Sequence, residues 1–371
     1  MTKIVYIVSH IDKANEFEWL IDRIDRRRFE ISFISIHEKD STSLASYCEK
    51  KSVPFYHVRY LNKKSLFSAI LKTFRILKKI QPDAVHAHLF EGGFIGITAA
   101  WLARIRHRLY TRHYSNYHHK YFPNGLKYDR WINKRSTKIV SISKVVSSIL
   151  VNKENVPEEK IVLIHHGFPV ELFGDVAPER TASVRERHGI PENKVIIGVI
   201  ARYTYWKGVQ DIIPAFQKIN AENPNTHLVL ANANGDYSKE IKHILSNLPE
   251  KSYTEITFEP DNAALFKCFD IFVHTPVDKE SEAFGQIYIE ALLSGLPCVF
   301  TLSGVANEII INGENAMVVD YENSQEICQA ICNLLESSER KKQLAVEGKK
   351  VASSFTISKK ILELEKLYSE L

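Results

Sequence analysis

The stretch IFVHTPVDKESEAFGQIYIEALLSGLPCVF, residues 271–300, contains a complete strand–loop–helix–strand unit. Its apolar ends, 271–274 and 298–300, have the length and the residue types of buried strands. Between them, Gly285 permits the tight turn that begins a helix, and Gly295-Leu-Pro297 ends that helix. Two strands joined through a helix predict a parallel pair in one sheet.

The same alternation continues from this unit along the whole chain. Strands are predicted at 3–8, 30–36, 54–58, 83–88, 108–111, 138–142, 161–164, 195–200, 227–230, 255–258, 271–274, 298–300 and 317–319. Amphipathic helices are predicted at 15–27, 42–51, 65–80, 92–105, 143–153, 208–221, 238–247, 284–294, 323–336, 339–353 and 357–369. The fold class is therefore α/β, with two Rossmann-like doubly wound parallel-sheet domains.

The segment 171–180 contains Gly174 and Pro178 and has little periodicity, so it is predicted to be a linker. The first domain then spans 1–173 and the second spans 180–356. Ligands of such sheets bind outside the carboxyl ends of the strands. We therefore expect the two domains to face each other across a cleft that holds the site.

The bulk composition suits a two-domain globular protein, with 371 residues of which 44% are apolar. No apolar stretch is long enough to cross a bilayer, and no secretory segment is recognisable. The five cysteines are scattered, which favours a reducing compartment. A cytoplasmic protein is expected.

Charge divides the chain unevenly. Residues 1–170 contain 29 Lys and Arg against 15 Asp and Glu, whereas the remainder contains 20 against 29. The basic front half points to an anionic partner, for which a membrane surface, a polyphosphate acceptor and nucleic acid are the candidates. Within it, 63–79 forms a basic amphipathic helix that suits an anionic membrane, or else packs on its sheet with a solvated basic face.

A second basic cluster, 107–122, mixes aromatic and cationic residues that suit sugar rings and a lipid-linked pyrophosphate. No nucleic-acid-binding motif accompanies it, so no nucleic acid partner is expected.

Two carboxylates flank the helix that begins after Gly285. Glu282 lies in the loop ahead of this helix, and Glu290 lies inside it on the same face as Gln286. The unpaired N–H groups of a helix start bind anions, and a carboxylate accepts hydrogen bonds from sugar hydroxyls. A ligand with both phosphates and hydroxyls fits this pattern, although an ordinary helix with one Glu that aids its N-cap and another on its solvated face fits it as well.

Two cations follow the first strand of the back half. Arg202 comes directly after the strand at 195–200, and Lys207 precedes Gly208 and the next helix. Arg offers a fork to phosphate oxygens and Lys a mobile charge, at the sheet edge where a diphosphate would lie. The alternative is a pair of solvated loop cations.

These motifs together resemble the retaining glycosyltransferase family 4, of the two-domain GT-B type. The resemblance is carried by the motifs Ala201-Arg202, Lys207-Gly208, Glu282-x7-Glu290, Ser294-Gly-Leu-Pro297, Gly304-Val-Ala-Asn-Glu308 and Asn312-Gly-Glu-Asn-Ala-Met-Val-Val-Asp320, and in the front half by Pro82-Asp-Ala-Val-His-Ala-His88 and Thr111-Arg-His113. It spans nearly the whole chain and is specific in residues 198–320.

The resemblance implies a role for each matching residue. Arg202 and Lys207 hold the donor diphosphate, Glu290 binds the ribose hydroxyls, and Glu282 contacts the transferred sugar. The neighbouring backbone N–H groups belong to Ala283, Phe284, Gly285 and Gln286. His113 faces the sugar from the other domain, Ser143 lies near the cleft, and the terminal helix, 357–371, crosses back onto the first domain. Retention is implied by the family alone.

The chain departs from the family pattern in the front half. The loop 9–14 has no glycine, His166-Gly-Phe-Pro169 replaces a common Asn-Gly-Val-Asp, and Tyr114 stands where Asp is common. These changes fit an unusual acceptor or a weakened enzyme. The histidine pairs 118–119 and 165–166 lack metal-ligand spacing, so they are expected to be polar loop residues, and neither a metal nor a cofactor is expected.

The expected function is therefore a retaining glycosyltransferase. It moves a hexose-type sugar from a nucleotide-sugar donor to a saccharide or lipid-linked saccharide acceptor, in surface polysaccharide or glycolipid synthesis at the inner face of the membrane. Two alternatives stay open, a sugar-nucleotide epimerase on the same fold and a non-catalytic nucleotide-sugar-binding protein.

Overall fold

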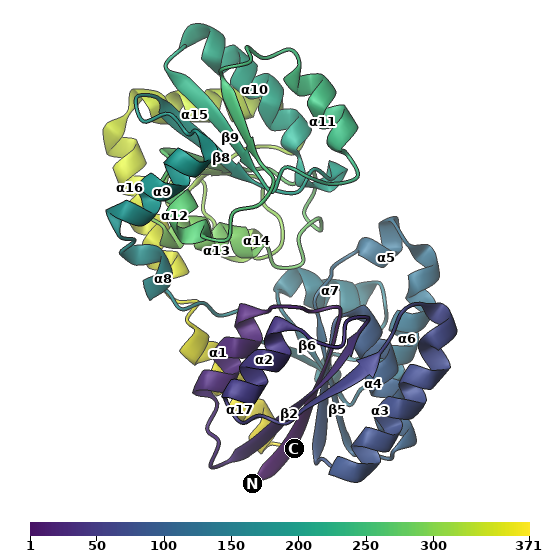
Figure 1. The fold of residues 1–371 in the computed structure, drawn as a ribbon. Helices are drawn as coiled ribbons and strands as arrows, with labels where there is room; N and C mark the ends of the chain where they lie inside the picture. The colour runs from purple at the N-terminus through teal and green to yellow at the C-terminus, as the bar shows by residue number, and fades with distance from the viewer. The chain divides into compact units, whose positions relative to one another are not determined.

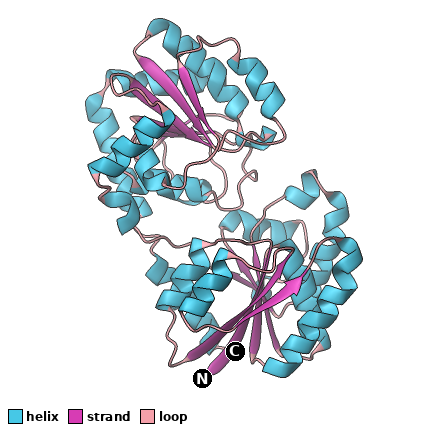
Figure 2. Ribbon diagram, in the orientation of Figure 1, coloured by secondary structure: helices cyan, strands magenta, loops and turns pink.

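The computed structural model describes residues 1–371, which form two compact units (Figure 1). The first unit comprises Met1–Gly167 and Ile357–Leu371, and the second comprises Phe168–Thr356. Each unit contains one sheet with helices packed around it (Figure 2). The prediction of two doubly wound α/β domains is confirmed at the level of the fold.

The first sheet has seven parallel strands in the order β3-β2-β1-β4-β5-β6-β7. Their bounds are β1 Thr2–Ser9, β2 Phe29–His37, β3 Phe55–Arg59, β4 Ala84–His88, β5 His107–Arg112, β6 Lys138–Ser141 and β7 Ile161–Leu163. The central strand β1 is buried from Ile4 to Ser9 without alternation, as expected for a strand covered on both faces.

Helices cover both faces of this sheet. They are α1 Asn15–Arg23, α2 Ser43–Lys50, η1 Lys63–Ser65, α3 Leu66–Ile80, α4 Phe90–Leu102, α5 Tyr117–Lys120, η2 Pro123–Gly125, α6 Leu126–Arg135, α7 Lys144–Asn152, η3 Glu158–Lys160 and α17 Ile357–Ser369. One hydrophobic core joins β1 and β2 to α1, α2 and α17. Helix α4 packs on β1, β4 and β5, flanked by α3 and α6. The chain's last helix, yellow in Figure 1, therefore packs against its first, α1.

The second sheet has six parallel strands in the order β10-β9-β8-β11-β12-β13. Their bounds are β8 Val195–Ile200, β9 Thr226–Ala231, β10 Tyr253–Ile256, β11 Ile271–His274, β12 Cys298–Phe300 and β13 Met317–Val318. The helices are α8 Glu171–Gly174, α9 Pro178–His188, η4 Tyr205–Lys207, α10 Val209–Glu222, α11 Ser238–Leu245, α12 Asn262–Phe266, α13 Gln286–Leu293, α14 Ala306–Ile309, α15 Ser324–Glu336 and α16 Ser338–Ala352. The main core lies between the sheet and α10, α11 and α15.

Each sheet has one point where the strand order reverses. It lies between β1 and β4 in the first unit and between β8 and β11 in the second. At such a point the loops after the two neighbouring strands lead to opposite faces of the sheet, which leaves room for a ligand at the carboxyl ends.

The segment 171–180 is not a linker without regular structure. It forms α8 and the start of α9, because Pro178 occupies the first turn of a helix, where its missing N–H costs nothing. The chain passes between the units at Gly167, and the Phe168 N–H donates to the carbonyl oxygen of Phe355 at 2.9 Å. Residues 168–173 therefore belong to the second unit.

The helix α6 was not predicted, because polar residues occupy its buried face. Asp129 and Asn133 are buried there, and they pair with charged groups on neighbouring elements. This arrangement hides the apolar period that reveals an ordinary helix.

The basic segment 63–79 packs as part of the first unit. Helix α3 buries Ala69, Thr73 and Leu77 and contacts α4, and its Lys and Arg side chains are exposed. None of the chain's helices combines the length and the apolar character needed to cross a membrane.

Candidate active site

The loops that follow β8 and β11 touch at the reversal point of the second sheet. Lys207 ends η4, and Gly208 follows it with φ +71°. A β-carbon on Gly208 would lie 1.8 Å from the carbonyl oxygen of Thr275, which directly follows β11. Only glycine allows this approach, and the approach brings Lys207 to the end of the neighbouring strand.

Glu282 is the centre of a buried cluster in this place. The Lys207 Nζ lies 2.5 Å from Glu282 Oε1, and the His274 Nε2 lies 2.9 Å from the same oxygen. Burial alone would raise the pKa of Glu282, but the Lys207 charge and the His274 hydrogen bond outweigh it and lower the pKa to about 2. Glu282 is therefore ionised at any physiological pH.

The protonation of His274 follows from its surroundings. Burial lowers the pKa of His274, so the ring is neutral and its proton lies on Nε2, where it donates to Glu282. Its Nδ1 is buried without a partner. The Lys207 and His274 contacts use only Oε1 of Glu282, so its Oε2 can accept hydrogen bonds from ligand hydroxyls.

The loop after β12 packs against the loop that contains Glu282. The Glu282 N–H donates to Ser303 Oγ at 2.9 Å, and the Val305 N–H donates to the carbonyl oxygen of Phe284 at 2.8 Å. Gly304 has φ +56°, and a β-carbon there would lie 2.5 Å from the Phe284 carbonyl oxygen. The Gly304 motif recognised in the sequence thus lets two loops pack backbone to backbone.

Helix α13 begins directly after this loop, and no side chain caps it. Gly285 precedes it with φ +80°, and Gln286 at its first position is exposed. Uncapped N–H groups at a helix start attract anions. The N–H groups at the start of α13 therefore lie beside the Glu282 cluster.

Glu290 lies one turn further along α13, on the face of Gln286. Its carboxylate is half-buried and has no side-chain partner within the chain. Burial raises the pKa of Glu290 to about 7. The raised pKa reflects the free-energy cost of burying the ionised carboxylate. A ligand that donated hydrogen bonds to it would offset this cost.

Arg202 is exposed immediately after β8 and makes no ion pair or side-chain hydrogen bond within the chain. Arg202 and Lys207 both follow β8, and the start of α13 follows β11, the strand next to β8 at the reversal point. The second unit thus gathers two cations, two carboxylates and helix-start N–H groups around one reversal point. This combination suits a ligand that carries phosphates and hydroxyls.

His113 lies in the first unit, directly after β5, among other histidines. Its Nε2 lies 3.0 Å from the Nδ1 of His88, and its ring stacks on His166 with centroids 5.7 Å apart. Burial is the main cause that lowers the pKa of His113 to about 3, so the ring is neutral. It can position a hydroxyl as donor or acceptor, without carrying a charge.

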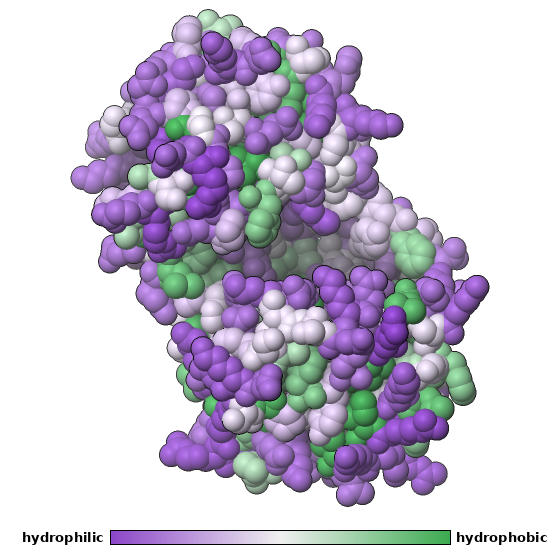
Figure 3. Space-filling view, viewed as in Figure 1, coloured by the Kyte–Doolittle hydropathy of each residue, from purple (hydrophilic) through white to green (hydrophobic).

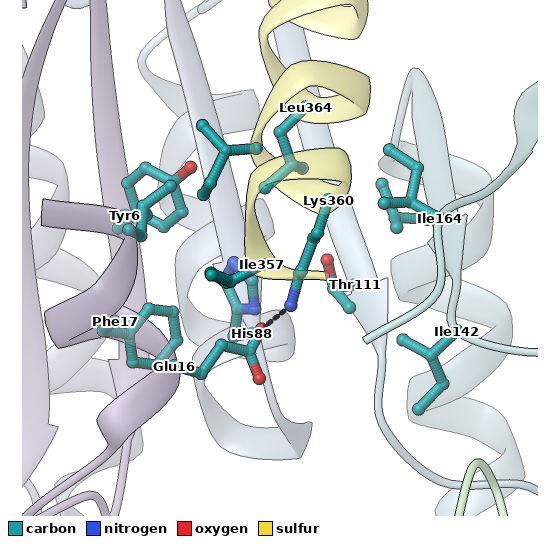
Figure 4. A pocket seen from close by; sticks show the side chains of 13 residues that line it. Tyr6, Glu16, Phe17, His88, Thr111, Ile142, Ile164, Ile357, Lys360 and Leu364 are labelled. Carbon is teal, nitrogen blue, oxygen red and sulfur yellow. Dashed lines mark hydrogen bonds and ion pairs between the residues drawn. The ribbon is translucent and has the colours of Figure 1, made fainter. Parts of the chain in front are cut away.

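A charged pair anchors this histidine cluster. Figure 4 shows Lys360 reaching from the start of α17 to Glu16 on α1, beside a cavity of about 20 Å³. The Nδ1 of His166 lies 3.1 Å from Glu16 Oε2. Burial would raise the pKa of Glu16, but Lys360 and His166 hold it well below its ordinary value.

The predicted site residues do not include this pair, although the sequence contains a signal for it. Lys360 follows Ile357 by three positions and precedes Ile361 and Leu364, so it occupies a core position of an apolar stripe. A lysine at such a position needs a buried partner, and Glu16 supplies it from 344 positions away.

Of the histidines expected to be polar loop residues, His118 and His166 are buried, and His118 lies in helix α5. His166 is paired as described, and the Nδ1 of His118 lies 2.6 Å from Asp129 Oδ2. Arg112 is also buried and binds both Asp129 and Glu154. The polar cluster around Asp129 holds the loop after β5 in place, because unpaired charges cannot stay buried.

Ser143 caps helix α7 in the first unit, where its side chain accepts from the Val146 N–H at 3.2 Å. No cluster of three or more His, Cys, Asp or Glu side chains is arranged to hold a metal ion.

Two family models match the chain. The model described as Glycosyl transferases group 1 matches residues 181–351, and that described as Glycosyltransferase Family 4 matches residues 20–172. The first match contains the whole Lys207–Glu282–Glu290 arrangement, and the second contains His113.

Named relatives and solved structures agree with these matches. The capsular polysaccharide biosynthesis glycosyltransferase CapM of Staphylococcus aureus is 23% identical to this chain, and the match covers 82% of the length of each protein. The alpha-monoglucosyldiacylglycerol synthase of Streptococcus pneumoniae is 24% identical over 70% of this chain and 60% of its own. The crystal structure of Anabaena Alr3699/HepE in complex with UDP and glucose has a TM-score of 0.84 at 20% identity, with both chains fully covered.

Proposed function

Because the chain belongs to the group 1 glycosyltransferases of GT-B fold, we propose that it transfers a hexose-type sugar from a nucleotide-sugar donor to a saccharide or lipid-linked saccharide, with retention. The observation that carries the proposal is the buried Lys207–Glu282–His274 cluster beside the uncapped start of α13. UDP and glucose in the Anabaena structure of the same fold support a nucleotide-sugar donor.

The donor would be held by charge and by hydroxyl contacts. Arg202 and Lys207 pair with the diphosphate, together with the N–H groups at the start of α13. Glu290 accepts hydrogen bonds from the ribose hydroxyls. Glu282 offers its unpaired Oε2 to the transferred sugar, while Lys207 and His274 hold its Oε1.

Transfer then breaks the bond between the anomeric carbon and the diphosphate oxygen. The acceptor hydroxyl attacks from the face that the diphosphate leaves, and its proton passes to the departing phosphate oxygen. Positive charge aimed at the diphosphate lowers the barrier by several kcal/mol, about 3 for each well-placed donor. In this proposal Arg202, Lys207 and the helix start supply that charge, so no metal is called on. The neutral ring of His113 is proposed as a further catalytic residue.

The acceptor is proposed to be a saccharide or lipid-linked saccharide, handled at the inner face of a membrane. The names of the two relatives, a capsular polysaccharide enzyme and a glucosyldiacylglycerol synthase, support this class. So does the exposed basic face of α3, which suits peripheral contact between 63–79 and anionic lipid.

The test is calorimetric titration with UDP, UDP-glucose and GDP-mannose, followed by transfer assays with membrane extracts. We expect one nucleotide to bind, and Arg202→Ala and Glu290→Ala to weaken it by roughly tenfold or more. Lys239→Ala, an exposed cation elsewhere in the unit, is the matched control and should bind normally. If no nucleotide binds, or if all three variants bind alike, the proposed donor site is wrong.

A further inference from the structure

The first unit contains a second cavity, separate from the donor-binding residues. It has a volume of about 460 Å³, within the range of small-molecule sites. Its wall is formed by the segment after β3, the start of α3 with the residues before it, α4, the segment after β5, and α6. Most of the wall is aromatic, with Phe90, Phe94, Tyr114, Phe122 and Tyr128 among its rings.

These rings brace one another. Tyr128 packs edge-to-face on Phe94 and on Phe90, with centroids 4.9 Å and 5.7 Å apart, and Phe90 packs edge-to-face on Tyr114 at 6.4 Å. Such contacts hold rings in place by about 1 kcal/mol each. The wall is therefore largely formed before any ligand arrives.

The wall is mainly apolar, although the Glu91 carboxylate and the Tyr60 and Tyr128 hydroxyls also line it, and two of its polar side chains are already paired. The Tyr114 hydroxyl donates to Asp129, and His118 is paired with the same carboxylate at 2.6 Å. A sugar needs several donors and acceptors for its hydroxyls, and a pocket without them leaves those hydroxyls unsatisfied. An apolar chain has no polar groups that would stay unpaired there, and the transfer of its surface out of water is favourable.

A cation stands at the edge of the cavity. Lys63 lines it, with Nζ 6.0 Å from the Phe122 ring centroid, and is exposed without an ion pair. Leu61 and Phe67 nearby in sequence are 54% and 78% exposed. Apolar patches also interrupt the hydrophilic surface on the face shown in Figure 3. Charge beside exposed apolar residues suits an amphiphile that carries an anion.

We propose that this aromatic pocket binds the apolar chain of a phosphate-bearing amphiphile, whose phosphate pairs with Lys63. The residues that support this site and this class of ligand all belong to the first unit. Only the further step, that the amphiphile is the lipid-linked acceptor, rests on the proposed function.

The test is calorimetric titration of the full chain with dodecyl phosphate, kept monomeric below its micelle concentration. We expect saturable binding with one site per chain. Lys63→Glu should weaken it by roughly tenfold, because a charge-assisted contact becomes a repulsion. Lys72→Glu makes the same charge change on the exposed face of α3, outside the pocket, and should leave the affinity within about twofold.

Two further arms separate the pocket from general attraction. Dodecanol should still bind, more weakly, and should not respond to Lys63→Glu. Leu66→Trp, which fills the pocket at its α3 side, should abolish binding of both ligands. Donor nucleotide affinity should be unchanged in all three variants, so a failure here is distinguishable from a failure of the donor site.

Three results would overturn the proposal. The first is no saturable binding of the monomer to the wild-type chain. The second is equal weakening by Lys63→Glu and Lys72→Glu. The third is adsorption only to vesicles of anionic phospholipid, which would assign the charge of α3 to a membrane surface and leave the pocket without a role.

Discussion

Replacing Glu290 by Gln should stabilise the ligand-free protein, and more so as the pH rises. Burial raises the pKa of Glu290 from 4.5 to about 7, so the folded chain holds a proton that the unfolded chain releases between these values. Stability therefore falls as pH rises through this window, and the loss is complete above pH 7. Gln is neutral throughout and escapes the loss.

The size of the effect follows from the same values. The difference between 4.5 and about 7 corresponds to at most about 3 kcal/mol at pH 8. Glu290 is only half-buried, and water screens its charge, so about 1–2 kcal/mol is the expected difference. At pH 4.5 both side chains are largely uncharged in the folded state, and the difference should shrink to a few tenths of a kcal/mol.

Urea denaturation of wild type and Glu290→Gln at pH 4.5, 6 and 8 measures this difference. Glu314→Gln, which removes an exposed carboxylate from the same unit, is the control and should show no such trend. A stability difference that is the same at all three pH values would refute the reasoning.

The same carboxylate links ligand binding to pH. If Glu290 accepts ribose hydroxyls, binding favours its ionised form and releases a proton. Nucleotide affinity should then rise between pH 6 and pH 8 in wild type, but not in Glu290→Gln. Binding enthalpies in buffers of different ionisation enthalpy report the released proton directly.

Three other substitutions test the architecture of the two units. Gly208→Ala should cost more in thermal unfolding than Gly295→Ala, because both have positive φ but only the first meets a carbonyl oxygen, at 1.8 Å; equal costs would contradict the close loop contact. Lys207→Met should reduce transfer by about 10²–10³-fold while unfolding changes by about 1–3 kcal/mol, and a loss of transfer no larger than the loss of folded protein would make this lysine structural. Lys360→Met should lower the free energy of unfolding, measured in urea, by about 3 kcal/mol, because it leaves the partly buried Glu16 carboxylate without its lysine. The control Lys366→Met, at an exposed position, should change it by less than about 0.5 kcal/mol, and similar values for both variants would show that the Lys360–Glu16 pair is not stabilising.

The two site carboxylates show how environment divides one residue type into two roles. Glu282 and Glu290 are eight positions apart, yet burial with a lysine lowers the pKa of one to about 2 and burial without a partner raises the other to about 7. Glu282 therefore carries a permanent negative charge, which fixes its own loop and pairs with Lys207. Glu290 can exchange a proton when a ligand arrives.

Much of the architecture was predictable because its signals are local. The apolar runs at β8, β11 and β12 and the glycine that starts α13 are short-range patterns, and the structure places each of these strands at the predicted residues. The parallel pairing of β8 with β11 follows from the helices between them. The loops that carry Arg202, Lys207 and Glu282 were thus assigned to strand ends from the sequence alone; their roles in donor binding stay predictions.

What only the tertiary structure decided depends on residues far apart in the chain. The pairing of Lys360 with Glu16 joins opposite ends of the sequence, and the aromatic pocket collects side chains from five separate segments. Periodicity in the sequence shows which face of a helix or strand is buried, but it does not show which polar group of another element will pair with a buried polar side chain. Buried charges and cavity walls are set by side chains that meet only when the sheet is complete, and for that reason no local pattern contains them.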